Sequence, residues 1–274
     1  VCDSEGTISD NDSVIFFNFR GDRALEITKA FEAEQLAEFD RGIRPDVMYA
    51  GMMENGGDLH APKLYLVNPP EIDRTMDEYL CATGVPQLAV SETQKFGHVT
   101  YFFNGGVEKP FDGEDRILVP SPRDVPTYDL APAMSARTVT DRFVENWNRG
   151  IYDLVVCNLA NGDMVGHTGV IPAAVTACET VDECVGRMEA AVRARNGRMI
   201  IIADHGNCEK MLSEDGRPHT AHTTNPVPCI LVDDEKGWSL KDGKLGDVAV
   251  TILSLWGMPV PAEMTGSCLA ERKG

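Results

Sequence analysis

The sequence predicts an α/β protein with a mostly parallel sheet and helices on both faces of that sheet. Three observations lead to this prediction. The apolar runs are continuous, stretches with helical spacing separate them, and 43% of the 274 residues are hydrophobic, without an apolar run of membrane-spanning length. Strands that are buried on both faces read as continuous apolar runs, and they alternate with helices when the sheet is parallel.

The first predicted elements form a short strand, helix and strand set. Residues 13–19 are a strand-like apolar run, 22–39 have the spacing of an amphipathic helix, and 46–52 read as a second strand. The segment 66–74, LVNPPEIDR, follows, and its adjacent prolines stiffen the backbone. We expect this segment to be a linker or hinge.

Beyond this segment, predicted strands and helices alternate. Gly150 and Gly257 each close a helix, because glycine readily adopts the left-handed conformation of a helix C-terminus. The predicted helices are 74–84, 137–150, 171–195 and 245–257, and the predicted strands are 86–91, 98–106, 153–159, 198–203 and 228–233.

The charge and the cysteines limit the classes of partner and compartment. A formal net charge of −18 argues against nucleic acid or an anionic membrane as a partner, whereas it suits a divalent cation. The eight cysteines include no CxxC pair, so free thiols in a reducing cytoplasm explain them better than disulfides or a zinc cage. The opening VCDSEGTISD has neither an initiator Met nor a signal pattern, and we expect the chain to be a piece of a longer polypeptide.

Acidic residues and histidines follow two of the best predicted strands. DLVVCNL runs into ANGDMVGHTG, which carries Asp163 and His167, and RMIIIA runs into Asp204 and His205. Sites in such sheets form beyond the carboxyl ends of the strands. Asp163 and His167 are four residues apart, so a helical turn or compact loop can aim both at one cation, and His222 could complete a set of three.

Each of these signals also has an ordinary explanation. A lone Asp-His pair is usually a surface turn, and an Asp after a strand often caps a helix. Three such signals in one order favour a metal site, and carboxylate with imidazole suits manganese, zinc or magnesium. His98 is expected to be structural, with a supporting role open, and His219 either supports the site or faces solvent.

FNFRGDRALE is a candidate anion site. Arg20 lies at the exit of the first predicted strand and Arg23 in the first turn of the following helix. A helix N-terminus attracts anions, and a guanidinium fits phosphate or carboxylate. The alternative is a surface cluster in which Asp22 pairs with both arginines. Spacing alone gives no reason to select Lys95 in SETQKFGHV.

Five stretches resemble those of cofactor-independent, metal-dependent phosphoglycerate mutases of the alkaline phosphatase superfamily. They are NFRGDRA, SETQKFGHVTYFFNGG, NLANGDMVGHTG, ADHGNCEKM and HTAHTTNPVP, in the family's order over nearly the whole chain. The resemblance implies an alkaline-phosphatase-like fold, with residues 1–70 in a transferase domain and 71–274 in a phosphatase domain. It also implies interconversion of 3-phosphoglycerate and 2-phosphoglycerate in glycolysis and gluconeogenesis, in the cytoplasm, through a phosphoserine.

The resemblance implies a role for each candidate residue. Two divalent ions are expected, most readily manganese, with magnesium, zinc or cobalt as alternatives. The implied ligands are Asp163, His167 and His222 for one ion and Asp204 and His205 for the other, and the implied substrate-binding residues are Arg20, Arg23 and Lys95.

The sequence departs from this family in one large respect. It contains no stretch like NSEVGH, which carries the family's nucleophilic serine. We therefore expect the chain to be the C-terminal half, inactive alone, with the N-terminal half as its partner and a monomer when complete. The alternatives are another superfamily enzyme, such as a phosphopentomutase or phosphatase, and an inactive metal- or phosphate-binding fragment.

Overall fold

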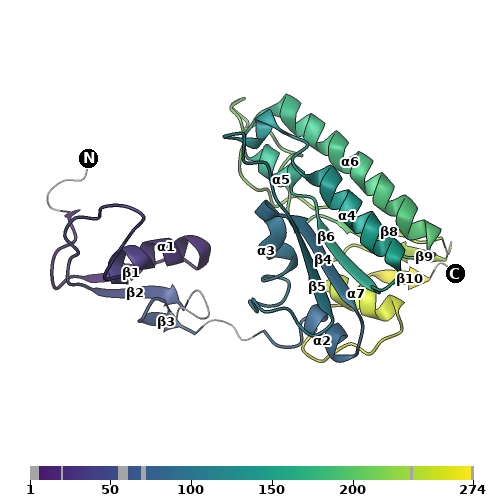
Figure 1. Ribbon diagram of the computed structural model, residues 1–274, viewed down its shortest axis with the longest axis horizontal. Helices are drawn as coiled ribbons and strands as arrows, with labels where there is room; N and C mark the ends of the chain where they lie inside the picture. Colours follow the sequence, from purple (N-terminus) through teal and green to yellow (C-terminus); the bar gives the residue numbers. More distant parts are fainter. Residues whose placement is uncertain (1–5, 20, 55–60, 69–71, 235–236, 273–274) are drawn as a thin grey trace. The chain divides into compact units, whose positions relative to one another are not determined.

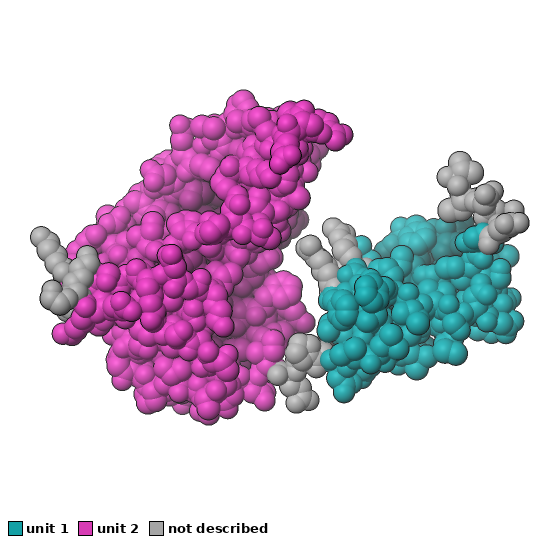
Figure 2. Space-filling view, turned by 180° about the vertical axis from the view of Figure 1, so that it is seen from behind, with its two compact units in different colours: residues 1–71 teal, residues 72–274 magenta. Residues whose placement is uncertain are grey.

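The computed structural model describes residues 6–19, 21–54, 61–68, 72–234 and 237–272, without the side chains of residues 21–23. The chain divides into two compact units, residues 1–71 and 72–274 (Figure 2). The adjacent prolines of the expected hinge, at positions 69 and 70, lie outside the described residues. The assignment of the two units to a transferase and a phosphatase domain stays a prediction.

Unit 1 is a three-stranded parallel sheet in the order β1-β2-β3, with helix α1 packed on it (Figure 1). Tyr49 of β2 faces the helix, where its ring stacks on Phe31 at 4.8 Å and its hydroxyl lies 3.1 Å from Thr28 Oγ1. Its elements are β1 (Ser13–Phe16), α1 (Gly21–Glu32), β2 (Met48–Met53) and β3 (Tyr65–Val67).

Helix α1 ends at Glu32, so the prediction of a helix to residue 39 is wrong. The guanidinium of Arg41 donates to the carbonyl oxygens of Ala30 at 3.0 Å and Glu34 at 2.9 Å. Arg44 donates to that of Glu32 at 3.1 Å. Side chains from beyond the helix thus satisfy carbonyl groups that a longer helix would pair internally. Strand β3 likewise corrects the prediction that the linker begins at residue 66.

The opposite face of the unit 1 sheet exposes apolar side chains. In the register of β1 and β2, Ser13 lies opposite Met48, and Ile15 lies on the same face. Ile15 is 59% exposed and Met48 is 62% exposed. Phe17, just beyond β1, is 79% exposed. We call these three residues the exposed sheet face.

Unit 2 contains a parallel sheet in the order β5-β4-β6, which confirms the predicted α/β class. All six residues of β4 (Gln87–Glu92) are buried. In β6 (Leu154–Asn158), Val155 and Cys157 pack against the core formed with α4 (Ala136–Arg149) and α6 (Ile171–Ala194). The intervening Leu154 packs instead with α2 (Met76–Ala82) and α7 (Asp247–Leu255). Helices therefore cover both faces of this sheet, as predicted (Figure 1).

The remaining ladders of unit 2 are short and antiparallel, and they join β7 to β8 and β9 to β10. Among the described strands, parallel pairing therefore occurs in the two three-stranded sheets, β1-β2-β3 and β5-β4-β6, and not in these two ladders. The other elements of this unit are η3 (Thr93–Lys95), α3 (Phe96–Val99), β5 (Glu114–Val119), η4 (Tyr128–Leu130), α5 (Asn161–Gly166), β7 (Met199–Ile202), β8 (Cys229–Val232), β9 (Trp238–Leu240) and β10 (Ala270–Arg272).

The predicted strand at 98–106 is wrong. The segment contains the end of α3 followed by turns, held by local hydrogen bonds such as Phe102 N to Gly97 O at 2.9 Å and Asn104 N to Thr100 O at 2.8 Å. Gly105 and Gly106 have φ values of 68° and 93°, which favour turns over a strand. The strand in this region is β5, whose charged beginning hid it from a search for apolar runs.

Among the described residues, no helix combines the length and the apolar character needed to cross a membrane.

Candidate metal centre

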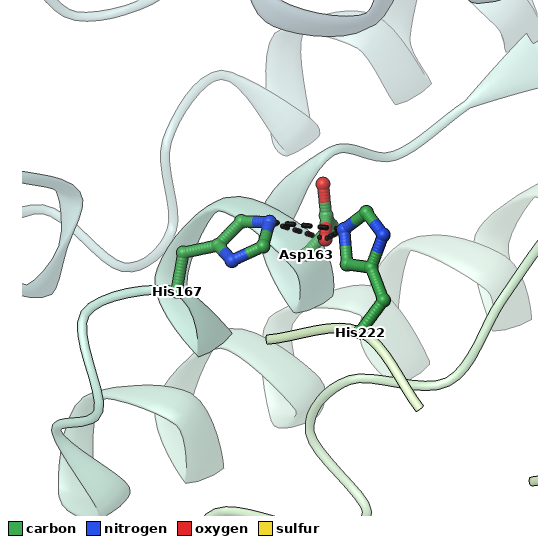
Figure 3. A group of neighbouring side chains, drawn as sticks. All are labelled: Asp163, His167 and His222. Carbon is green, nitrogen blue, oxygen red and sulfur yellow. Dashed lines mark hydrogen bonds and ion pairs between the residues drawn. The ribbon is translucent and has the colours of Figure 1, made fainter. Parts of the chain in front are cut away.

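Three side chains from unit 2 meet beyond the ends of its strands (Figure 3). Asp163 lies on α5, which follows β6, and His167 follows the last residue of that helix. The predicted helical turn is present, because His167 N donates to Asp163 O at 3.1 Å. His222 comes from the loop between β7 and β8, so a distant part of the chain completes the group.

The three ligand atoms converge closely. His167 Nε2 lies 3.0 Å from Asp163 Oδ1, and His222 Nε2 lies 2.9 Å from the same oxygen. The two Nε2 atoms are 3.0 Å apart. When the carboxylate is ionised and both Nε2 positions are unprotonated, all three atoms direct lone pairs towards one another. A cation at their centre would satisfy all three.

The Asp163 carboxylate is fixed from both sides. Lys95 Nζ donates to its Oδ2, and Asn207 Nδ2 donates to its Oδ1 at 2.7 Å. Its side chain is only 13% exposed, and the Lys95 side chain only 9%. Burial favours the neutral acid, but hydrogen bonds from Lys95 and Asn207 and the charge of Lys95 outweigh burial and lower the pKa of Asp163 to about 2. Asp163 therefore offers an ionised carboxylate with a set direction.

A backbone carbonyl orients His167. Its Nδ1 lies 2.6 Å from the carbonyl oxygen of Thr220, two residues before His222. The oxygen can only accept, so Nδ1 carries the proton and Nε2 presents its lone pair to the centre. Metal-bound histidines in proteins usually make this kind of contact through their second nitrogen.

The donor set and its spacing fit a divalent metal. One carboxylate oxygen with two imidazole nitrogens is typical of manganese or zinc ligands. Adjacent ligand atoms about 2.1 Å from an octahedral ion lie about 3.0 Å from one another, close to the spacing of these three atoms, whereas around a tetrahedral ion they lie about 3.4 Å apart. Among the described residues, Asp163, His167 and His222 form the one group of this kind.

Asp204 and His205 lie beside this group but are held more loosely. The side chain of Asp204 is 53% exposed, and its Oδ2 is 3.5 Å from His205 Nε2. His205 Nε2 is 3.9 Å from Asp163 Oδ1, and its ring stacks on that of His222 at 3.6 Å. These two residues can offer a carboxylate and an imidazole at one edge of the centre, but further ligands would have to complete a second site.

Glu209 ties together the two histidine-bearing ends of the loop between β7 and β8. Its Oε2 accepts from Asn207 N at 2.6 Å, and its Oε1 accepts from Asn225 Nδ2 at 3.0 Å and from Thr223 Oγ1. An isolated β-bridge joins Gly206 to Thr223 beside it. The hydrogen bond from Thr223 is the main cause of the lowered pKa of Glu209. This carboxylate therefore fixes the spacing between the segment of His205 and the segment of His222 within that loop.

Gly166 permits the close approach of Asn207 to α5. A Cβ at position 166 would lie 2.3 Å from Asn207 Oδ1 and 3.1 Å from Cys208 Sγ. The first distance is shorter than real Cβ contacts, so Asn207 would have to move, and the second would require Cys208 to shift by a few tenths of an ångström. The contact of Asn207 with Asp163 thus depends on the absence of a side chain one turn along the helix.

The other candidate residues have different outcomes. Arg20 lies outside the described residues, and so does the side chain of Arg23, so the anion site stays a prediction. His98 lies near enough to Lys95 for that charge, after burial, to lower the pKa of the imidazole. His219 Nδ1 is buried and finds no hydrogen-bond partner within the described part of the chain.

Sequence reasoning missed the residues that position the ligands. Asn207, Glu209 and the carbonyl of Thr220 each contact a ligand or fix its loop. Asn207 stands in ADHGN, two residues after His205, but the spacing gives no reason to prefer it over the other asparagines. Every residue has a backbone carbonyl, so the sequence cannot show which carbonyl orients a histidine.

Comparison with known proteins identifies the family. The profile described as "Metalloenzyme superfamily" matches residues 18–260. The chain belongs to this superfamily. Membership implies divalent metal ions, and the group at Asp163 is a place that could hold one.

Curated relatives carry one description. The chain is 52% identical over 268 residues to the 2,3-bisphosphoglycerate-independent phosphoglycerate mutase of Lawsonia intracellularis, covering 97% of this chain and 52% of that protein. It is 49% identical over 266 residues to mutase 2 of Methanosarcina acetivorans, covering 97% and 50%. These matches confirm the resemblance predicted from the sequence. The chain spans about half the length of the curated relatives it matches.

A solved structure extends the likeness to the fold. The phosphoglycerate mutase of Leishmania mexicana, crystallised at low cobalt concentration, matches with a TM-score of 0.83 and 39% sequence identity. The match covers 99% of this chain and 53% of that one.

Proposed function

We propose that this chain is the metal-holding part of a cofactor-independent phosphoglycerate mutase. The complete enzyme would interconvert 3-phosphoglycerate and 2-phosphoglycerate in glycolysis and gluconeogenesis through a phosphoserine. The observation that carries the proposal is the convergence of Asp163, His167 and His222 within 3.0 Å, in a chain similar to mutases over 97% of its length.

The proposed ligands divide into two sets. Asp163, His167 and His222 would hold one ion, and Asp204 and His205 would contribute to the second. Manganese suits this mixture of carboxylate and imidazole, with magnesium, zinc and cobalt as alternatives. When bound, the ions would supply positive charge that stabilises the transferring phosphoryl group.

Lys95 would act at the boundary between metal and substrate. Its ammonium is almost buried and pairs with Asp163 Oδ2, which leaves Oδ1 for the cation. Its remaining protons could donate to a phosphate or carboxylate oxygen of the substrate. Arg20 and Arg23, near the start of α1, would hold the other anionic group, because guanidinium groups bind such oxygens in pairs.

The other half of the enzyme is the proposed partner. It would bring the nucleophilic serine, for which these 274 residues contain no matching motif. The exposed sheet face of unit 1 supports this view, since Ile15, Met48 and Phe17 are each more than half exposed. Apolar groups on one face of a sheet are normally covered by another layer. The cytoplasm is the proposed location, supported by the free state of the described cysteines.

Reconstitution tests the proposal. The chain would be mixed with the N-terminal half of the Lawsonia intracellularis mutase and manganese, and conversion of 3-phosphoglycerate to 2-phosphoglycerate would be followed. We expect turnover from the mixture and none from either half alone. Asp163→Asn is the control, because it should abolish turnover without affecting the exposed sheet face.

Other outcomes would change the conclusion. Turnover by the chain alone would contradict the missing-serine argument. A mixture that acts on ribose phosphates in preference to phosphoglycerate would point to a phosphopentomutase. Manganese binding without any turnover would leave a non-catalytic metal-binding fragment.

A further inference from the structure

Two free cysteines meet where α6 passes the loop that follows β7. Cys178 belongs to α6, and Cys208 lies three residues after His205. Each thiol is the main cause of the shifted pKa of the other, which is lowered for Cys178 and raised for Cys208, so the two side chains are neighbours. Both also line one cavity of about 230 Å³, whose other residues include Val175 and Met211. Neither cysteine is among the proposed metal ligands.

The two thiols have different surroundings. Cys178 is exposed, whereas Cys208 is half-buried and its Sγ donates to Gly162 O at 2.8 Å. The contact with Cys178, then burial and the charges of Asp163 and Glu209, raise the pKa of Cys208. A thiol has one proton, and the acceptors around Cys208 all favour that proton staying there. Cys178 is therefore the thiol that reacts first with a reagent from solution.

We propose that Cys178 and Cys208 form a dithiol that a small disulfide converts reversibly into an intramolecular disulfide. The Cys178 thiolate attacks one sulfur of the small disulfide, forms a mixed disulfide and releases one small thiol. Cys208 then loses its proton to solvent, and its sulfur attacks the Cys178 sulfur and releases the second small thiol. The protein loses two electrons and two protons, and one small disulfide becomes two thiols.

Closing this bond would disturb the metal centre. The two sulfurs must approach to about 2.05 Å. Cys208 then no longer has a proton to donate to Gly162 on α5. Asn207, next in the chain, would be drawn away from Asp163 with it. This consequence rests on the proposed function of the metal centre, whereas the disulfide itself does not.

Other cysteines provide matched controls. Cys184 is fully buried and lies near Cys157 in the core under α4 and α6, so a small disulfide cannot reach that pair. Cys229 is exposed, and burial is the one cause of its raised pKa. Cys229 should therefore form a mixed disulfide with one half of the small disulfide molecule and react no further.

Peptide mapping tests the proposal. The chain would be treated with rising concentrations of hydroxyethyl disulfide, a neutral reagent, until Cys229 is modified. The reaction would then be quenched with acid, and the digested chain would be analysed by mass spectrometry. We expect a cross-link between the peptides of Cys178 and Cys208 that dithiothreitol reverses. Cys208→Ser should leave a stable mixed disulfide at Cys178, Cys178→Ser should leave Cys208 unmodified, and Cys184→Ser should change nothing.

Two results would overturn the proposal. The first is that, at the reagent concentration that modifies Cys229, Cys178 and Cys208 are both still reduced or Cys178 carries only a mixed disulfide. The other is a cross-link from either cysteine to a different partner.

Manganese titration then separates the two claims. In a Cys229→Ser background, the oxidised chain should bind manganese about tenfold more weakly than the reduced chain, because ligand-orienting contacts typically contribute at least that factor. Equal affinities would refute the link to the metal centre and leave the disulfide intact. No binding by the reduced chain would refute the metal assignment in the proposed function, and the cross-link map would still decide the dithiol.

Discussion

The two candidate metal carboxylates, Asp163 and Asp204, differ in how firmly the chain holds them. Asp163 is nearly buried and fixed by Lys95 and Asn207, with two imidazole nitrogens within 3.0 Å. Asp204 is 53% exposed, and its histidine neighbour is 3.5 Å away. The packing of this chain holds one set of candidate ligands in place. The other set depends on groups that these contacts do not supply.

The largest expected effect is on the stability of the metal-free chain. Asp163→Asn removes the charge that pairs with the nearly buried Lys95, and breaking such a pair should lower the free energy of unfolding by about 3 kcal/mol. Asp204→Asn alters an exposed group and should change it by less than about 0.5 kcal/mol. Urea denaturation in EDTA measures both. Equal losses would mean that the two carboxylates are held alike.

The next effect concerns the two stacked histidines. Manganese at about 100 times its dissociation constant should stabilise the chain by about 2.7 kcal/mol. His222→Ala should abolish this gain, because it removes an Nε2 that lies 2.9 Å from Asp163 Oδ1. His205→Ala should keep most of it. Thermal unfolding with and without manganese measures the stabilisation in each variant. If His205→Ala also lost the stabilisation, His205 would belong with Asp163, His167 and His222 as a ligand of the same ion.

A smaller effect is expected from the amide that orients Asp163. Asn207→Ala should weaken manganese binding about tenfold, since outer contacts of metal ligands typically contribute that much. Asn225→Ala is the matched control, because its amide reaches Glu209 and not Asp163. Isothermal titration measures both affinities. If Asn225→Ala weakened manganese binding equally, the effect would come from a general disturbance of the loop between β7 and β8 and not from the contact of Asn207 with Asp163.

The smallest effect should come from Glu209, which links the two ends of the loop between β7 and β8. Glu209→Gln keeps the shape of the side chain but removes the charge that accepts from Asn207 N and Thr223. We expect manganese affinity to fall by less than about tenfold, because the β-bridge from Gly206 to Thr223 remains. A larger loss than that of Asn207→Ala would reverse the ranking of these two contacts.

The sequence predicted the parts of the fold that depend on long regular patterns. Strand β4 is buried along its whole length, and α6 runs from Ile171 to Ala194 close to its predicted bounds. The segment 98–106 misled the prediction, because its apolar residues lie in turns closed by Gly105 and Gly106. Strand β5 was missed since it begins with three charged residues, of which Glu114 is buried and accepts a hydrogen bond from Asn104 at 2.8 Å.

The candidate site divides in the same way. Asp163 and His167 could be paired from their spacing, because one helical turn brings them together. The closeness of His222 depends on how a loop from beyond β7 folds back, which no local pattern determines. Asn207 was missed because its function lies in one contact that only the folded chain creates.

Gly166 makes no bond to any ligand, yet a single methyl group there would collide with the amide oxygen of Asn207 at 2.3 Å. Tolerance to mutation around this centre therefore depends partly on the absence of a side chain at position 166. In a saturation screen, even alanine at position 166 should score with the ligand replacements, although the residue has no chemistry of its own to lose.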